Sequence, residues 1–233
     1  MIDIRRFDTL GHADHGWLDA RHHFSFANYR DPARMGWGTI RVWNDDAIAA
    51  QSGFPPHPHR DMEIVTYVRS GAITHQDSLG NRGRTAAGDV QVMSAGTGVT
   101  HAEFNVEDET TTLFQIWIEP RAASVTPAWG AQPFPRGDRA GRLVTLASGY
   151  ADDIEGGALT INADARVLAA TLAVGQAVEH RVGAGRHAYL VAATGALTID
   201  GTPVAARDGV ALDEGRYRIE AVAAAELVLV DAP

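Results

Sequence analysis

Short runs of β-branched and aromatic residues alternate, along the whole chain, with turns that contain glycine or proline. Such runs predict β-strands, whereas the apolar spacing of an amphipathic helix is hard to find over any window of helix length. A mostly β protein is therefore expected, and a sandwich or barrel is favoured because the crossover helices of parallel βαβ units are missing. The predicted strands include residues 38–43, 63–68, 89–93, 113–118, 142–146, 167–174, 188–193 and 227–230.

Residues 127–141 concentrate proline and glycine and interrupt this rhythm of strands. A chain of 233 residues is long enough for two small domains, each with a core of its own. We therefore predict a domain boundary in this segment, with one domain at residues 1–130 and the other at residues 131–233.

The two halves of the chain also repeat one another. Residues 67–74 resemble residues 191–198 in their order of strand, glycine turn and strand, and residues 87–92 resemble residues 207–212. Any two β-turns look partly alike, but two matched segments in the same order favour a duplicated β unit.

Composition restricts the chemistry that is open to the chain. It has no cysteine and ten histidines, so a bound metal would take nitrogen and oxygen ligands. A net charge of −9, without any run rich in lysine or arginine, argues against direct nucleic-acid binding. No window is apolar enough to cross a membrane, and residues 1–6 lack the features of a signal peptide, so we expect a cytoplasmic protein.

A pair of histidines marks the entrance of one predicted strand. His57 and His59 lie two residues apart, so both imidazoles can point to the same face of that strand. Pro56 and Pro58 remove two hydrogen bonds from the ladder, which is typical of an edge strand and leaves room for an open site.

His101 and Glu103 repeat this spacing some forty residues later, with one nitrogen and one carboxylate ligand. Two such pairs on facing strands would make a compact set of three nitrogens and one oxygen. This set suits Fe(II), Mn(II), Co(II), Ni(II), Cu(II) or Zn(II), and it suits Ca(II) or Mg(II) poorly. Four protein ligands leave two positions of an octahedral ion open, which favours a reactive site over a structural one.

Other residues compete with this interpretation. Glu63 lies an even number of residues beyond His59 and could face the same way in a regular strand, and the general cupin pattern, to which this region is similar, selects Glu63 as a ligand. His12, His15 and His75 are open to a plainer interpretation, as satisfied polar residues or surface side chains.

Longer segments resemble the pirin family of cupins. The resemblance covers most of residues 20–121 and is weak beyond the boundary segment. It implies an all-β bicupin, that is, two tandem cupin barrels of the jelly-roll (double-stranded β-helix) type. The segments that carry it are residues 21–29 (RHHFSFANY), 56–63 (PHPHRDME), 75–81 (HQDSLGN), 93–105 (MSAGTGVTHAEFN) and 115–120 (QIWIEP).

In pirins the histidines of the PHPH segment and the histidine and glutamate of the HxE segment bind one metal. The resemblance therefore implies one set of ligands here: His57, His59, His101 and Glu103. Iron(II) is the expected metal, with manganese, nickel, cobalt, copper and zinc as alternatives. Glu63 is then not a ligand, and it is left as an acceptor near the ligands, a buried partner of an arginine such as Arg60, or a plain structural carboxylate.

The family includes proteins assayed as quercetin 2,3-dioxygenases and eukaryotic transcriptional cofactors, and this chain resembles the bacterial, quercetinase-like branch. The resemblance implies a metal-dependent dioxygenase that takes a small planar aromatic substrate and dioxygen, and that opens a flavonol ring with release of carbon monoxide. Glu103 is the catalytic candidate, because a carboxylate beside the metal could take the substrate hydroxyl proton. Phe24, Phe26, Phe54 and Met93 are candidate lining residues of the pocket, with core packing as the alternative.

Two other functions stay open. A metal- or redox-sensing regulatory protein would catalyse nothing and act through a protein partner. A sugar-isomerase-like or storage cupin with the same site would carry a cluster of lysine or arginine for phosphate, which is not found.

The second domain is expected to be a degenerate cupin without metal. The repeat places Arg181 and Gly183 near the positions of the histidine pair, and alanines near the positions of the later pair. His180 and His187 are separated by a glycine-rich turn and are interpreted as ordinary residues.

Overall fold

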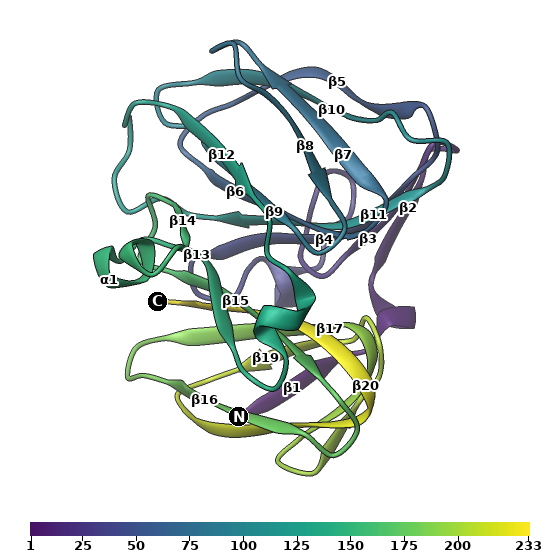
Figure 1. Cartoon of the computed structure of the whole chain (residues 1–233), viewed down its shortest axis with the longest axis vertical. Helices are drawn as coiled ribbons and strands as arrows, with labels where there is room; N and C mark the ends of the chain where they lie inside the picture. Colours follow the sequence, from purple (N-terminus) through teal and green to yellow (C-terminus); the bar gives the residue numbers. More distant parts are fainter.

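The computed structural model describes residues 1–233, which form two β units stacked on one another (Figure 1). The only helices are α1 (Ala151–Glu155) and the 3-10 helices η1 (Phe7–Thr9), η2 (Pro32–Arg34) and η3 (Arg136–Arg139). The all-β prediction is thus confirmed. None of these helices has the length and apolar character needed to span a membrane.

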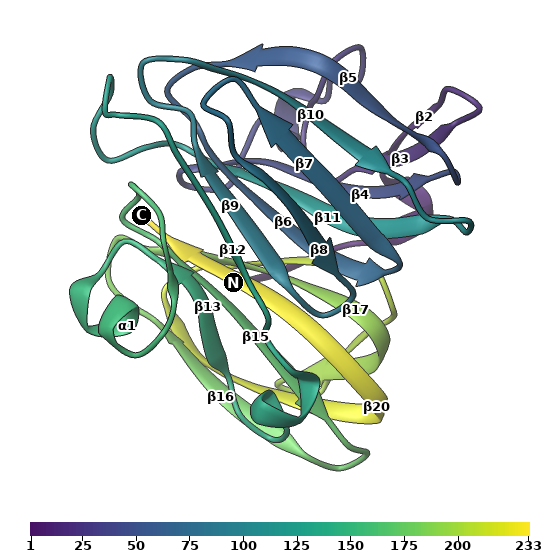
Figure 2. The same cartoon turned by 45° about the horizontal axis from the view of Figure 1, so that its top comes forward.

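The first unit consists of two sheets that face each other (Figure 2). Its strands are β2 (Gly11–Asp14), β3 (Leu18–His22), β4 (Ile40–Ile48), β5 (Ser52–His59), β6 (Glu63–Ser70), β7 (Ala72–Asp77), β8 (Arg82–Ala86), β9 (Val90–Ser94), β10 (Val99–Asn105), β11 (Thr111–Ile118) and β12 (Ala128–Gln132). A seven-stranded sheet has the order β12-β9-β6-β11-β4-β3-β2, and a four-stranded sheet has the order β5-β10-β7-β8.

The second unit is one nine-stranded sheet in which two long strands change partners along their length. Its strands are β1 (Ile2–Arg5), β13 (Val144–Ser148), β14 (Leu159–Thr160), β15 (Arg166–Leu172), β16 (Ala177–Val182), β17 (His187–Ile199), β18 (Thr202–Val204), β19 (Gly209–Leu212) and β20 (Gly215–Ala232). The main order is β1-β19-β17-β20-β15-β13-β14, and β16 and β18 pair with β20 and β17.

The strand order repeats between the two units, in agreement with the predicted duplication. The series β9-β6-β11-β4 of the first unit corresponds to β19-β17-β20-β15 of the second, and β5-β10-β7-β8 corresponds to β16-β20-β17-β18. Gly71 and Gly195, the turn glycines of the matched segments, both have positive φ angles, 72° and 76°. Glycine is favoured at both turns because it adopts this conformation without steric cost.

The N-terminal segment and the proline-rich segment each contribute one edge strand. The N-terminal strand β1 crosses to the second unit and pairs with β19, and β12, inside the proline-rich segment, pairs with β9 of the first unit. The predicted boundary after residue 130 falls inside β12 and stays a prediction.

Strands in the middle of the seven-stranded sheet are buried on both faces. Val65 and Tyr67 belong to an apolar core that both units share, and Trp43 packs against Tyr189 of the second unit with ring centroids 5.5 Å apart. Thr66, between Val65 and Tyr67, points the other way, since alternate residues of a strand face opposite sides. One face of this sheet therefore forms the interface, and the other face lines the interior of the first unit.

A buried ion pair also ties the units together. Arg139 is 1% exposed, and its guanidinium donates hydrogen bonds to the Glu226 carboxylate at 2.6 Å and to the Tyr67 hydroxyl at 2.7 Å. Removing one partner would leave a buried charge uncompensated, which is costly.

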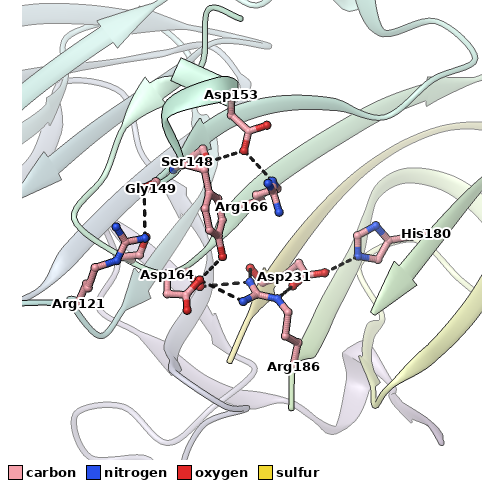
Figure 3. Close-up of polar contacts among 11 residues, drawn as sticks. Arg121, Ser148, Gly149, Asp153, Asp164, Arg166, His180, Arg186 and Asp231 are labelled. Atoms are coloured by element: carbon pink, nitrogen blue, oxygen red, sulfur yellow. Dashed lines mark hydrogen bonds and ion pairs between the residues drawn. The ribbon is translucent and has the colours of Figure 1, made fainter. Parts of the chain in front are cut away.

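Polar contacts join the segment after β11 to the second unit (Figure 3). Arg121 donates to the backbone oxygens of Gly149 and Ala163, both at 3.2 Å. In the same region His180 Nε2 lies 2.8 Å from Asp231 Oδ2, and Arg186 donates to the same carboxylate (Figure 3). His180 is thus a member of an ion-pair cluster of the second unit.

Candidate metal centre

The four-stranded sheet brings the histidines of both motifs together. β5 and β10 are hydrogen-bonded neighbours rather than facing strands, and His101 on β10 lies directly opposite His57 on β5. His57 and His59 share one face, as their spacing predicts, with ring centroids 4.8 Å apart. β5 is the edge strand of its sheet, which agrees with its prolines.

The three imidazoles form a tight cluster. Potential ligand atoms of His57, His59 and His101 all lie within 4.8 Å of one another. His57 Nδ1 lies 2.8 Å from the carbonyl oxygen of Pro55, which can only accept, so this nitrogen carries a proton and Nε2 is the nitrogen that faces the cluster. That Nε2 atom lies 3.1 Å from His101 Nε2.

His75 and Asp77, on the neighbouring strand β7, determine which nitrogen of His101 carries its proton. Asp77 accepts hydrogen bonds from the backbone of Leu79 at 2.9 Å and from Asn81, and its Oδ2 lies 3.1 Å from His75 Nε2. Burial acts to raise the pKa of Asp77, but these hydrogen bonds outweigh it and lower the pKa, so the carboxylate is ionised and His75 donates from Nε2. His75 Nδ1 is then an acceptor, 3.3 Å from His101 Nδ1. His101 therefore donates from Nδ1 and keeps its Nε2 lone pair.

Burial keeps the imidazoles of His59 and His101 neutral. It lowers the pKa of His59 to about 4, with a further contribution from the charge of His57. It lowers the pKa of His101 to about 3, with the charges of neighbouring histidines acting in the same direction. Neutral imidazole is the form that binds a metal ion.

This donor set fits a divalent metal ion. His57 Nε2 and His101 Nε2 lie 3.1 Å apart, so one cation can be held by both nitrogens. Nitrogens bound at about 2.1 Å to one metal, at right angles, lie about 3.0 Å apart, close to the observed distance. Clustered neutral imidazoles are ligands that suit transition metals.

Glu103 is buried beside the imidazole cluster. Its carboxylate forms a second group of potential ligands with His75 and His101. Gln91 donates to Oε1 at 2.7 Å, and Gln115 donates to Oε2 at 2.8 Å. Burial raises the pKa of Glu103 to about 7, although the hydrogen bonds that its carboxylate accepts act to lower it. The structure thus brings three of the four predicted ligands into one cluster and places the fourth in contact with its edge.

A row of polar side chains crosses the seven-stranded sheet beneath Glu103. Its members lie in register on five neighbouring strands, β3, β4, β11, β6 and β9: His22, Asn44, Gln115, Thr66 and Gln91. His22 Nδ1 lies 2.8 Å from Asn44 Oδ1, and the Thr66 hydroxyl donates to Gln115 at 3.1 Å. These contacts satisfy buried polar groups that would otherwise destabilise the fold.

A cavity of about 640 Å³ opens beside the imidazoles. Trp17, Phe26, Phe54 and Trp117 line it, and Trp17 and Phe54 make an edge-to-face contact with centroids 5.0 Å apart. His59 packs in the same way against Trp117, also at 5.0 Å. The volume and the aromatic lining are typical of a pocket for a small planar molecule.

Glu63 lies outside the imidazole cluster. The chain turns between β5 and β6, with Asp61 at a φ of 46°, so the alternation of β5 does not extend to Glu63. Its Oε2 accepts from the Ser94 hydroxyl at 2.5 Å and from the backbone N–H of Asn162, in the second unit, at 2.9 Å. Arg60, considered as a partner, is exposed instead. Glu63 therefore anchors the two units to each other.

Of the four residues expected to line the pocket, Phe26 and Phe54 do so, and the prediction is wrong for Phe24 and Met93. Phe24 lies in the core shared by both units, 4.9 Å from the ring of Tyr189, because the chain leaves β3 after His22 and runs toward the second unit. Met93 is buried in a small apolar cluster and does not reach the cavity.

Several cavity residues escaped the sequence analysis. His12 and His15 are exposed side chains, as one interpretation held, and they also line the cavity, whereas His75 is buried and contacts His101. The strand predicted at residues 38–43 continues as β4 to Ile48, which brings Asn44 and Asp46 to the cavity. The signal for them in the sequence was the alternation of polar residues along this strand, but two consecutive acidic residues, Asp45 and Asp46, obscured it.

The corresponding interior of the second unit is apolar. Val178 on β16 and Ile199 on β17 both lie opposite Ile219 on β20, and all three belong to an apolar cluster. His187 lies outside this cluster, with its ring centroid 4.9 Å from that of Trp37.

Two jelly-roll units with one strand order, and a histidine cluster with a buried glutamate inside the first, define a bicupin with a candidate divalent-metal site. Comparison with family models agrees: the model described as Pirin matches residues 4–118, and the Quercetinase C-terminal cupin domain matches residues 146–232. The chain belongs to the pirin family.

Relatives match over their full length. A pirin-like protein of Caulobacter vibrioides is 61% identical over 100% of both chains. A quercetin 2,3-dioxygenase of Escherichia coli is 40% identical and covers 100% of this chain and 99% of its own. The crystal structure of the bacterial pirin YhhW from Escherichia coli in complex with nickel(II) superposes with a TM-score of 0.93, at 40% identity, covering 100% of this chain and 99% of its own.

Proposed function

We propose that the protein is a metal-dependent dioxygenase that opens the heterocyclic ring of a flavonol, or of a similar planar phenol. The observation that carries this proposal is the cluster of three imidazoles beside an aromatic-walled cavity of about 640 Å³. A relative named quercetin 2,3-dioxygenase, 40% identical, supports the substrate class.

One set of residues would hold the metal, with iron(II) as the expected ion: His57, His59, His101 and Glu103. A metal bound there supplies the positive charge that stabilises the oxyanion of the substrate hydroxyl, and a path for electrons between substrate and dioxygen. The aromatic side chains orient the flat ring system of the substrate. The second unit supports the sheet from which the polar row beneath Glu103 projects.

Glu103 is the catalytic residue of this proposal. Its carboxylate accepts the hydroxyl proton of the substrate at an oxygen that its glutamine partners hold in place. A positioned carboxylate within hydrogen-bond reach of the hydroxyl can act as the general base of this step. Glu103→Gln should keep the metal and lose about 10²–10⁴-fold in turnover. A variant that keeps both the metal and full turnover would remove this role.

Anaerobic reconstitution tests the proposal. The protein is loaded separately with Fe(II), Mn(II), Ni(II), Co(II) or Cu(II), then exposed to dioxygen with quercetin, and flavonol loss and carbon monoxide release are measured. The His57→Ala/His101→Ala double variant is the control. Equal amounts of flavonol lost and carbon monoxide released, in the wild type only, are expected.

Stoichiometric metal without turnover on any flavonol would overturn the dioxygenase proposal. It would leave the metal site standing and favour a metal- or redox-sensing protein that acts through a protein partner.

A further inference from the structure

Asp46 is a buried carboxyl group on the side of the cavity opposite the imidazoles. It lies in the middle of β4, in the seven-stranded sheet, whereas the imidazoles project from the four-stranded sheet. Asp46 is 3% exposed and lines the cavity together with Asn44. The two residues are two positions apart on one strand and therefore share the inward face.

The surroundings of Asp46 leave part of its carboxyl group without a partner. Its Oδ1 atom is buried and forms no hydrogen bond with any protein group. Its register neighbours on the adjoining strands are Leu113 on β11 and Ala20 on β3, which are both apolar. Buried polar groups are satisfied as a rule, so an unsatisfied one that lines a cavity points to a group that a ligand completes.

The next residue shows that the chain can satisfy a carboxylate on this strand. Asp45 points to the opposite face of β4, where Arg69 and Arg207 both donate hydrogen bonds to it. Asp46 has no such cation. Burial, followed by the negative charges of Asp45 and Glu103, raises the pKa of Asp46 well above its ordinary value, which favours the carboxylic acid form. A carboxylic acid can donate one hydrogen bond and accept others.

Three polar side chains that line the cavity from the same sheet, His22, Asn44 and Gln115, already have partners. His22 is paired with Asn44, and Gln115 holds Glu103. A planar ligand that reaches the imidazoles with one hydroxyl would lie between the aromatic walls. Compared with these three side chains, Asp46, on the sheet opposite the imidazoles, is the one that is free to bind a second hydroxyl.

We propose that Asp46 is a specificity residue that binds a hydroxyl group of the ligand remote from the hydroxyl at the metal site. The ligand class is then a planar polyphenol with one hydroxyl at the metal site and a second hydroxyl on the pendant phenyl ring. This inference rests on the proposed function and adds to it a requirement for the second hydroxyl.

The test measures binding rather than turnover. Nickel-loaded protein is titrated under nitrogen with quercetin, kaempferol and galangin, which carry two, one and no hydroxyls on the pendant phenyl ring, and tryptophan quenching gives each dissociation constant. The variants are Asp46→Leu, which is apolar, and Asp46→Asn, which keeps a hydrogen-bonding group. Asp152→Leu, on the exposed surface of α1, is the matched control.

The wild type and the control should bind quercetin or kaempferol about tenfold or more tightly than galangin, because a site built around a hydroxyl of the pendant ring disfavours the analogue that lacks it. Asp46→Leu should abolish this difference while galangin binding and nickel content stay unchanged, and Asp46→Asn should keep part of it. An undiminished preference in Asp46→Leu, or no preference in the wild type, would overturn the role of Asp46 alone. Failure of every flavonol to bind the nickel-loaded wild type would overturn the proposed function and this inference together.

Discussion

Replacing Asp77 by asparagine should weaken metal binding although Asp77 is not a ligand. Oδ1 of Asp77 accepts from the backbone N–H groups of Leu79 and Asn81, and Oδ2 faces His75 Nε2 at 3.1 Å. In Asp77→Asn the amide oxygen must serve the two backbone donors, so the amide NH₂ faces His75. His75 then accepts at Nε2 and carries its proton on Nδ1, toward His101.

That change of tautomer reaches the metal site. His101 Nδ1 lies 3.3 Å from His75 Nδ1, so two N–H groups would meet unless the His101 proton moves to Nε2, the atom that faces His57. Either the hydrogen bond between His75 and His101 is lost, or the Nε2 lone pair of His101 is no longer available to the metal. A lost buried hydrogen bond costs about 1–3 kcal/mol, and each 1.4 kcal/mol is about tenfold in affinity. Nickel affinity should therefore fall about 10–100-fold, the usual effect of removing a partner of a ligating histidine.

Calorimetric titration of the apoprotein with nickel(II) measures this effect. His75→Phe, which keeps a ring beside Trp129 but offers no acceptor, should show a similar loss. Asp89→Asn is the matched control, because Asp89 also accepts a backbone hydrogen bond, from Phe134 at 2.9 Å, but contacts no histidine of the cluster. Unchanged nickel affinity in a correctly folded Asp77→Asn protein would refute the reasoning.

Three further predictions concern stability and are read by urea unfolding. The pKa of Asp46 is raised in the folded state, so the wild type loses stability as pH rises above the ordinary value of 3.8. Asp46→Asn should therefore be more stable than the wild type by about 0.5–2 kcal/mol at pH 8, and this difference should shrink toward pH 4. A difference that stays constant with pH would contradict this prediction. Gly83→Ala places a Cβ atom 2.3 Å from the Trp129 ring and should cost about 1–3 kcal/mol and shift tryptophan emission; no change in either would contradict this packing. Arg139→Met leaves Glu226 buried with its closest cation removed and should lower the free energy of unfolding by about 3–5 kcal/mol. Adding Glu226→Gln should restore part of this stability, and equal stability of the single variant and the wild type would contradict the buried pair.

Local patterns in the sequence were enough to predict the fold class and the cluster of histidines. Alternation on one short strand puts His57 and His59 on one face, and the turn glycines at positions 71 and 195 reveal the duplicated strand order. Both signals act over a few residues, where backbone geometry alone decides the outcome.

Long-range packing decided what sequence could not predict. The parity argument that drew Glu63 toward the site fails because the chain turns at Asp61, and only the second unit provides Asn162 as the partner of Glu63. The role of His75 depends on the pairing of β7 with β10, and the exposure of Asp46 to the cavity depends on how far β4 extends. Strand neighbours of this kind are set by tertiary structure and leave no mark within a single sequence.

Anomalous diffraction from a crystal of the nickel(II)-loaded protein, recorded at the nickel edge, tests the central claim most directly. One strong peak per chain is predicted, within bonding distance of the Nε2 atoms of His57 and His101 and of a ring nitrogen of His59, with the Glu103 carboxylate turned toward it. A peak at other residues, or no peak in metal-saturated crystals, would contradict the assignment of this cluster as the metal centre.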